Sequence, residues 1–360
     1  MSELTANPGS TTTFGRVMPV DNDWLKRSVP EACIDPRRPI VDPHHHIWDA
    51  IPENLPNNGN DAHQPYRLQD YVADVQSGHN TVATIYMECH NAYRSSGPDE
   101  LKVVGETEFA VSLGDRSESG EFGSLRVCQG IVGSADLTMG ADVVRVLEAH
   151  IAVAKGRFRG VRASAGYHPD PVIGNTGYAQ NKYHLSTFQQ GAKLLPKYDL
   201  VLDAWVFFNQ LEEIATLARA CPDTEIVACH CGGPLGYGPY KGKSDEVFRV
   251  WRTRIKELAK HPNVTMKLGG MMIRLGAIDF RSLATPPGSA EIATLWGPYV
   301  ATCIEEFGAD RCMFESNFPV EKLGASWVTL WNAFKLMAMG GSEDEKNSLF
   351  AGTAKRVYRV

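Results

Sequence analysis

The stretch "PIVDPHHHIWDA" (residues 39–50) begins as a short apolar run and passes directly into three consecutive histidines. Only eleven histidines occur among the 360 residues, so a cluster of three stands out. A strand of a parallel sheet reads as a continuous apolar run, because helices cover both faces of the sheet. Residues 39–46 therefore predict a buried strand that ends in polar, reactive side chains.

Seven similar runs follow this first strand along the chain. They are residues 81–88, 126–135, 158–164, 200–207, 224–231, 264–270 and 311–317. Amphipathic helical patterns lie between them, at residues 142–154, 210–221, 244–261 and 298–308. Eight strands that alternate with helices predict an α/β fold, a single-domain (β/α)8 TIM barrel over residues 39–360. An open doubly wound sheet is the alternative, but no Gly-rich phosphate loop follows the first strand.

The two ends of the chain add to this barrel. Residues 1–38 are rich in Pro, Ser, Thr and Asn without periodicity, and they predict an N-terminal arm over the main body. Residues 343–360 predict an extra C-terminal helix that closes the bottom or side of the barrel. Loops after the predicted strands four, six and seven are long, and a barrel enzyme builds its pocket from such loops.

Composition restricts the class of protein. The chain is 43% hydrophobic and 22% charged, with a formal charge of -6 and no long charged runs, which argues against nucleic-acid and anionic-membrane partners. No stretch is long and apolar enough for a membrane span, and the polar N-terminus does not resemble a secretory signal. Most of the eight cysteines lie in apolar runs, which favours free, buried thiols. We therefore expect a soluble, cytoplasmic protein.

The histidines of the first strand are the first candidates for chemistry. Alternate residues of a strand share a face, so His44 and His46 point into the barrel mouth while His45 points away. Such a pair can bind a metal, or can bind and protonate a carbonyl substrate; a structural role is the alternative. In "ACHCGGP", alternation places either His230 or the thiols of Cys229 and Cys231 inside the barrel, and we favour His230.

Further candidates lie at the ends of other strands. Glu315 and Asn317 share a face of the last strand, which neighbours the first strand where the barrel closes. Glu88 ends the second strand, and Arg162 ends the fourth. A guanidinium at this position suits a carboxylate or enolate oxygen of a substrate. A structural ion pair within the barrel is the alternative for Arg162.

The motifs "DPHHHIWD", "FRGVR", "LDAWVF", "CHCGGP" and "RCMFESNFPVEK" occur in this order between residue 39 and the C-terminus. Together they resemble the amidohydrolase-2 family, (β/α)8 barrels of the amidohydrolase superfamily. Within it the chain looks most like 2-pyrone-4,6-dicarboxylate lactonase-like hydrolases, which are related to metal-dependent decarboxylases of aromatic acids. The resemblance implies that the family's strand-one pair falls on His44 and His46. It also implies that the histidine that polarises or protonates the substrate is His230.

Two departures from the family pattern concern the metal. The histidine that ends strand five in metal-binding relatives corresponds here to Phe208, with Asn209 beside it. The strand-eight aspartate is replaced by Asn317. Two histidines and an amide make a poor zinc site, so we expect no cofactor. The alternative is one divalent metal ion, zinc or manganese, with the strand-one pair as ligands.

The function expected from these observations is hydrolysis of a small carboxylated or aromatic-derived lactone without a metal. The three mouth histidines would polarise the carbonyl, Arg162 would bind an acid group, and Glu315, Glu88 or an imidazole would act as the base. Further candidate substrate contacts on the loops are Arg94, Tyr167, His168, Tyr178 and Arg274. A C–C lyase acting on an aromatic acid, by decarboxylation or a retro-aldol reaction, is one alternative. A non-catalytic binding protein is another. The expected partner is a small molecule that bears a carboxylate or an aromatic ring, and the family resemblance also suggests a homodimer.

Overall fold

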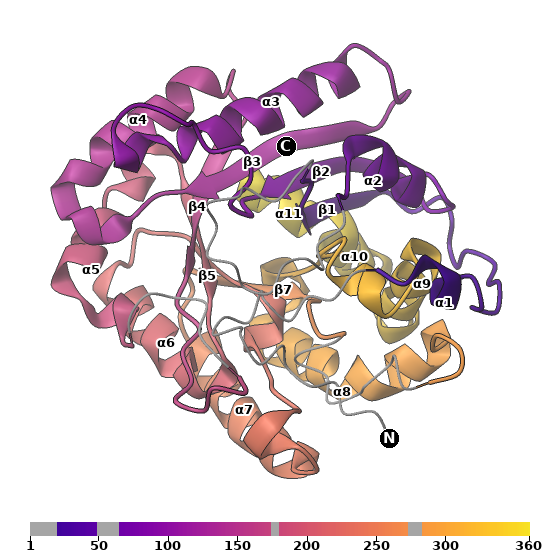
Figure 1. The fold of residues 1–360 in the computed structure, drawn as a ribbon. Helices are drawn as coiled ribbons and strands as arrows, with labels where there is room; N and C mark the ends of the chain where they lie inside the picture. Colours follow the sequence, from indigo (N-terminus) through magenta and orange to yellow (C-terminus); the bar gives the residue numbers. More distant parts are fainter. Residues whose placement is uncertain (1–19, 49–64, 174–179, 273–282) are drawn as a thin grey trace.

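Eight parallel strands form one sheet whose order follows the chain from β1 to β8 (Figure 1). This computed structural model describes residues 20–48, 65–173, 180–272 and 283–360. The strands are β1 (Ile40–His45), β2 (Thr81–Met87), β3 (Arg126–Ser134), β4 (Phe158–Ser164), β5 (Val201–Trp205), β6 (Ile226–Ala228), β7 (Val264–Leu268) and β8 (Cys312–Phe314). The first and last strands meet through main-chain bonds, from His46 N to Phe318 O at 2.8 Å and from Asn317 N to His44 O at 2.8 Å. The expected eight-stranded barrel is confirmed.

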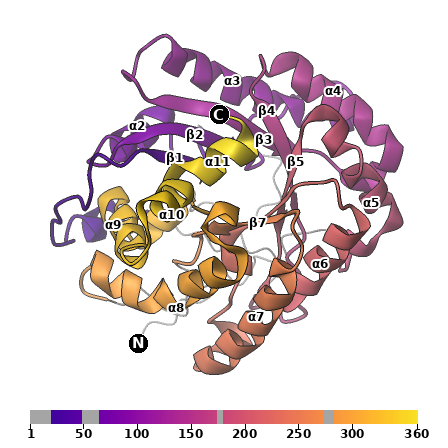
Figure 2. The same cartoon turned by 180° about the vertical axis from the view of Figure 1, so that it is seen from behind.

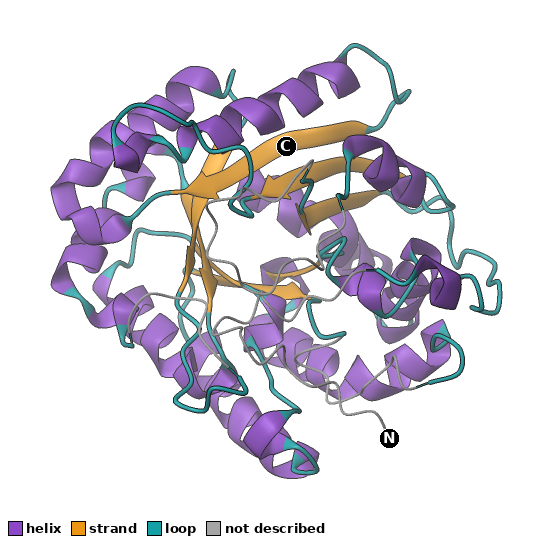
Figure 3. Ribbon diagram, in the orientation of Figure 1, coloured by secondary structure: helices purple, strands orange, loops and turns teal. Residues whose placement is uncertain are grey.

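Helices surround the strands on the outside of the barrel (Figure 3). They are α1 (Asn22–Leu25), α2 (Leu68–Val75), α3 (Val104–Glu118), α4 (Val144–Val153), α5 (Ser186–Ala192), α6 (Leu211–Ala220), α7 (Ser244–Ala259), α8 (Ser289–Phe307), α9 (Trp327–Met337), α10 (Glu343–Asn347) and α11 (Thr353–Tyr358). The helix expected at residues 298–308 begins earlier, at Ser289. There the Glu291 carboxylate accepts a bond from Gly288 N at 2.8 Å and stabilises the first turn.

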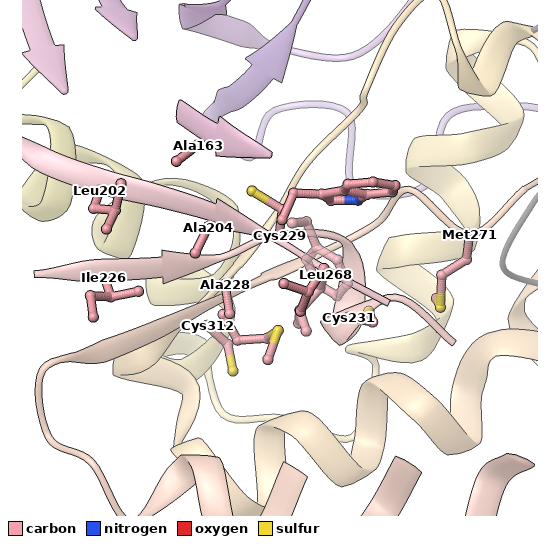
Figure 4. Packing of buried hydrophobic residues seen from close by; sticks show 14 of the residues in the cluster. Ala163, Leu202, Ala204, Ile226, Ala228, Cys229, Cys231, Leu268, Met271 and Cys312 are labelled. Atoms are coloured by element: carbon pink, nitrogen blue, oxygen red, sulfur yellow. The ribbon is translucent and has the colours of Figure 1, made fainter. Parts of the chain in front are cut away.

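The outer face of the sheet packs against these helices. Figure 4 shows part of this buried layer, in which short side chains of the strands lie beside sulfur atoms. The labelled strand residues include Leu202, Ala204, Ile226, Ala228 and Cys312, all fully buried. The eight cysteines are free thiols, and six of them are buried. No helix in the described part of the chain is long and apolar enough to cross a membrane.

Part of the inside of the barrel is an apolar layer. This layer consists of side chains from six strands: Val41, Ala83, Ile85, Met87, Val132, Val201, Val227 and Met313. The C-terminal segment closes it, because Ala351, Ala354, Val357 and Tyr358 belong to the same cluster. From behind, α11 lies across this end of the barrel (Figure 2). The extra C-terminal helix predicted from the sequence therefore covers the barrel bottom.

The described part of the predicted arm, residues 20–38, is tied to α8 and α9. Trp24 Nε1 donates to Leu283 O at 2.9 Å, and Ser289 N donates to Glu31 Oε1 at 2.7 Å. Lys335 of α9 donates to Asp35 O at 2.6 Å. Residues 1–19 of the predicted arm lie outside the described residues.

Candidate active site

A layer of charged and polar side chains lies above the apolar layer, toward the C-terminal ends of the strands. It consists of His44, Arg162, Asp203, Lys267 and Glu315, and we call it the polar layer. Asp203 and Glu315 follow the inward-facing Val201 and Met313 of their strands by two, as alternation along a strand requires. All five are at most 5% exposed. The C-terminal mouth is where barrel enzymes place their catalytic groups, so the polar layer is the candidate active site.

His44 and His46 face each other inside the mouth, with their Nε2 atoms 3.2 Å apart. His46 Nδ1 lies 2.9 Å from Met87 O, which fixes the orientation of its ring. Burial lowers the pKa of both imidazoles well below 6.5, and nearby Lys267 and Arg162 lower the pKa of His44 and His46 respectively. His45 points the other way and stacks on Tyr71 with ring centroids 4.1 Å apart. The orientation expected from strand alternation is confirmed.

Glu315 lies between two imidazoles. Its Oε1 accepts bonds from His230, at 2.7 Å from Nδ1 and at 3.1 Å from the main-chain N. Its Oε2 lies 2.8 Å from His44 Nδ1, but this approach lacks the geometry of a hydrogen bond. Burial opposes ionisation of this carboxyl, yet His230 and His44 together hold the pKa of Glu315 well below 4.5. Glu315 is therefore a carboxylate that can stabilise a positive charge on either imidazole.

His230 reaches the polar layer through a turn of the backbone. Strand β6 ends at Ala228, and His230 has a φ of 56° in the left-handed region. His230 points inward, as the sequence favoured, but the premise that an inward His230 excludes the neighbouring thiols is wrong for Cys229. His230 contacts Glu315 while Cys229 Sγ lies 3.7 Å from Asp203 Oδ1. Strict alternation does not apply beyond the last residue of the strand.

Arg162 forms a buried ion pair with Glu88. Its Nε donates to Glu88 Oε1 at 2.7 Å, and its Nη2 donates to the main-chain oxygen of the same residue. Burial opposes ionisation of this carboxyl, but Arg162 and then His90 lower the pKa of Glu88. Nη1 lies 3.5 Å from His44 Nε2. The structural ion pair considered for Arg162 is thus present, and Nη1 is the part of the guanidinium that faces the histidines.

Sequence reasoning missed a second buried ion pair, between Lys267 and Asp203. The Lys267 ammonium lies 2.6 Å from Asp203 Oδ1 and 3.4 Å from His44 Nδ1. Burial opposes its charge, but Asp203 raises the pKa of Lys267 above 10.5. Both residues are single charges inside apolar strands, in "VTMKLGG" and "LVLDAWVF". That contrast is a signal in the sequence that could have identified them.

The remaining predicted residues lie around this cluster or beyond it. Asn317 meets His44 only through the main chain, and its Nδ2 lies 3.4 Å from Glu321 Oε1. Arg94 pairs with Glu108 at the surface. Tyr167 and His168 are half-buried in the loop after β4, where His168 Nε2 lies 3.0 Å from Tyr240 OH. Tyr178 and Arg274 lie outside the described residues. The structure thus brings together His44, His46, Glu88, Arg162, His230 and Glu315.

The site also contains donors for a metal ion. Within the described ranges, one group of three such side chains has its ligand atoms within 4.8 Å of one another, namely His44, His230 and Glu315. Two imidazoles and a carboxylate are usual donors to zinc, so this group could hold a divalent ion. His46, expected as a ligand, is outside that group. Two cations adjoin it, because Lys267 lies 3.4 Å and Arg162 3.5 Å from nitrogens of His44.

Comparisons with known proteins agree with this architecture. The protein y4mH of Sinorhizobium fredii is 31% identical over 334 residues, which cover 89% of this chain and 98% of that protein. An L-fucono-1,5-lactonase of Burkholderia multivorans is 28% identical over 185 residues, covering 48% of this chain and 56% of the lactonase. The crystal structure of a zinc-bound amidohydrolase of Burkholderia multivorans superposes with a TM-score of 0.65 at 24% identity, covering 89% of this chain and 99% of that one. The sequence profile of the amidohydrolase family matches residues 41–360, and the chain belongs to this family.

Proposed function

We propose that this amidohydrolase-family protein hydrolyses a small lactone bearing a carboxylate or an aromatic ring, without a metal ion. The observation that carries the proposal is Glu315, a buried carboxylate that accepts a bond from His230 Nδ1 at 2.7 Å. A carboxylate on one ring nitrogen orients an imidazole and stabilises its protonated form, which makes the other nitrogen a general base. The lactonase among the relatives supports a lactone as the substrate class.

In the proposed reaction, His230 Nε2 removes a proton from water as the water oxygen attacks the lactone carbonyl. Arg162 Nη1 lies 3.5 Å from His44 Nε2 and would stabilise the negative charge that develops on the carbonyl oxygen. The bond between the carbonyl carbon and the ring oxygen then breaks. His230 returns its proton to that oxygen, and the product is an open-chain hydroxy acid.

The two cations beside His44 favour the metal-independent form of this reaction. A divalent ion at His44 would lie close to the Lys267 ammonium and the Arg162 guanidinium, both of which would repel it. The same cations attract an oxyanion or a carboxylate. The electrostatic role that a metal has in other hydrolases is here assigned to side chains of the protein.

A substrate screen with matched variants tests the proposal. The purified protein would be dialysed against a chelator, analysed for metals and assayed with lactones and with aromatic carboxylic acids. We expect ring-opened hydroxy acids without stoichiometric metal, and about a 100- to 10,000-fold loss of kcat in His230→Gln. His261→Gln, at the opposite end of the barrel, is the control and should retain full activity. Release of CO2 from an aromatic acid would identify a lyase, and activity that needs added zinc or manganese would refute metal independence.

A further inference from the structure

In the proposed hydrolysis Lys267 contributes only its positive charge, although it lies within the polar layer. Its side chain is fully buried, with Asp203 at 2.6 Å and the Tyr358 ring centroid 5.1 Å from Nζ. Asp203 is held in turn by Tyr358 OH, at 2.9 Å and 3.0 Å from its two oxygens. Burial of two charges is costly unless hydrogen bonds compensate them, and such pairs often have a specific role. The neighbour that Lys267 can influence is His44 Nδ1, at 3.4 Å.

The direction of the hydrogen bonds determines where His44 carries its proton. An ammonium group only donates, so the contact with Lys267 requires a lone pair on His44 Nδ1. The proton of the neutral ring then lies on Nε2, where His46 Nε2 at 3.2 Å is a nearer partner than Arg162 Nη1 at 3.5 Å, which only donates and makes no hydrogen bond to this tautomer. His46 Nδ1 must donate to Met87 O, which leaves His46 Nε2 as an acceptor. The bonds therefore run in one direction, from Lys267 through both histidines to the main chain.

The opposite tautomer of His44 would create a metal site. Its Nδ1 proton would lie 2.8 Å or less from Glu315 Oε2, although out of line with it, and both Nε2 atoms would then present lone pairs to each other. Their separation of 3.2 Å is suited to a shared ion, because zinc–nitrogen bonds are about 2.1 Å long. Lys267 and Glu315 thus compete for the same ring nitrogen. The outcome of that competition decides whether the histidine pair can chelate a metal.

We propose that Lys267 is a positioning residue that fixes the His44 proton on Nε2 and so prevents the His44–His46 pair from binding a divalent metal ion. The inference rests on the proposed metal-independent function, and it attributes the absence of metal binding to the Lys267 side chain. Asp203 and Tyr358 hold the ammonium in place, so the C-terminal helix contributes to the chemistry of the mouth.

Zinc binding by the full-length protein tests this role. Isothermal titration of chelator-treated protein with zinc would compare wild type, Lys267→Met and the double variant Asp203→Asn/Lys267→Met, which leaves no buried carboxylate unpaired. Lys335→Met is the matched control, since Lys335 is also buried but lies on α9 beside Asp35 and His79. We expect zinc affinity to rise by about 10- to 100-fold in the two Lys267 variants and to stay unchanged in the control. The gain should disappear when His46→Ala is added.

The tautomer can be measured directly in the wild type, even if no variant folds. Histidine ring 15N spectra, with the His44 signals assigned through His44→Gln, should show the proton on Nε2. A proton on Nδ1 in the metal-free wild type would overturn the inference, as would folded Lys267 variants that gain no zinc affinity. Stoichiometric zinc on the wild-type histidines would overturn both this inference and metal independence. Absence of lactone hydrolysis, with the spectra and titrations as expected, would overturn only the proposed substrate.

Discussion

At the scale of single residues, Glu315 organises the candidate site. It is fully buried and approaches two imidazoles from the strand that closes the barrel. The ionised form survives burial because His230 and His44 lie within 2.8 Å of its oxygens. A neutral group of the same shape would keep the packing but would lose the charge that the proposed base requires.

Glu315→Gln tests that requirement. The amide can still accept a bond at Oε1 but cannot stabilise a protonated His230, so we expect kcat to fall by about 1,000- to 10,000-fold. Glu213→Gln is the control: Glu213 is a buried glutamate on α6, bonded to Gln210 and outside the site. Steady-state kinetics on the lactone identified by screening would measure both. Activity within threefold of wild type in Glu315→Gln would contradict the role of the carboxylate.

Glu106 predicts a pH dependence of stability that is separate from the reaction. Burial, with the charge of Glu88, raises the pKa of Glu106 to about 7 from 4.5. The folded protein therefore binds a proton that the unfolded chain has released between these pH values. This contribution to stability is complete below pH 4.5 and is lost as the pH rises to about 7. At 1.36 kcal/mol per pH unit, the free energy of unfolding should fall by up to about 3 kcal/mol across this window.

Glu106→Gln should remove this part of the pH dependence. Glu106 Oε1 accepts bonds from Cys89 N, Asn91 N and Tyr86 OH, and an amide oxygen can accept the same bonds. Urea unfolding at pH 5 and at pH 7.5 would compare the variant with wild type. The stability of the variant relative to wild type should improve with rising pH. An unchanged difference between the two proteins would show that Glu106 does not titrate in this window.

At the scale of elements, the sequence predicted the strands better than the turns at their C-terminal ends. Continuous apolar runs located all eight strands, because a strand that is buried on both faces consists mainly of apolar residues. The positions beyond the strand ends depend on the backbone instead. His230 and Asn317 have φ values of 56° and 50°. The pattern of apolar and polar residues does not predict such left-handed backbone conformations. Lys267 and Asp203 are charged residues inside strands, and each is stabilised there by its ion pair with the other. Because that pairing depends on the tertiary structure, apolar periodicity alone could not assign them a role.

Gly270 is the clearest case of a backbone requirement at a strand end. It lies just beyond β7 with a φ of +66°, and a Cβ added there would lie 2.1 Å from His230 Nδ1. Gly270→Ala should therefore destabilise the fold by about 2–4 kcal/mol and displace the proposed base. Gly297→Ala on α8 is the control, because a Cβ there meets nothing within 4 Å. Urea unfolding and kinetics would measure both. Wild-type stability and activity in Gly270→Ala would show that the close approach is unimportant.

At the scale of the whole molecule, the C-terminus links the barrel bottom to the mouth. Val357 and Tyr358 complete the apolar layer that β1, β2, β3, β5, β6 and β8 begin. The hydroxyl of Tyr358 donates a hydrogen bond to Asp203, and Asp203 forms an ion pair with Lys267, which lies beside His44. A helix that closes one end of the barrel is therefore connected, through two buried residues, to the proposed chemistry at the other end.

This connection predicts a graded response at Tyr358. Tyr358→Phe removes only the hydroxyl and leaves a buried carboxylate with fewer donors, which should cost about 1–3 kcal/mol of unfolding free energy. Tyr358→Ala also opens a cavity in the apolar layer and should cost about 3–5 kcal/mol. Tyr198→Phe is the control, because that hydroxyl meets Glu148 at the exposed surface and should matter by less than about 0.5 kcal/mol. Equilibrium urea unfolding would rank the three variants. Equal stability of Tyr358→Phe and wild type would mean that the ion pair with Lys267 is enough to stabilise the buried Asp203 carboxylate, and that the Tyr358 hydroxyl is not needed. The Lys267 ammonium would then be positioned by the strands alone.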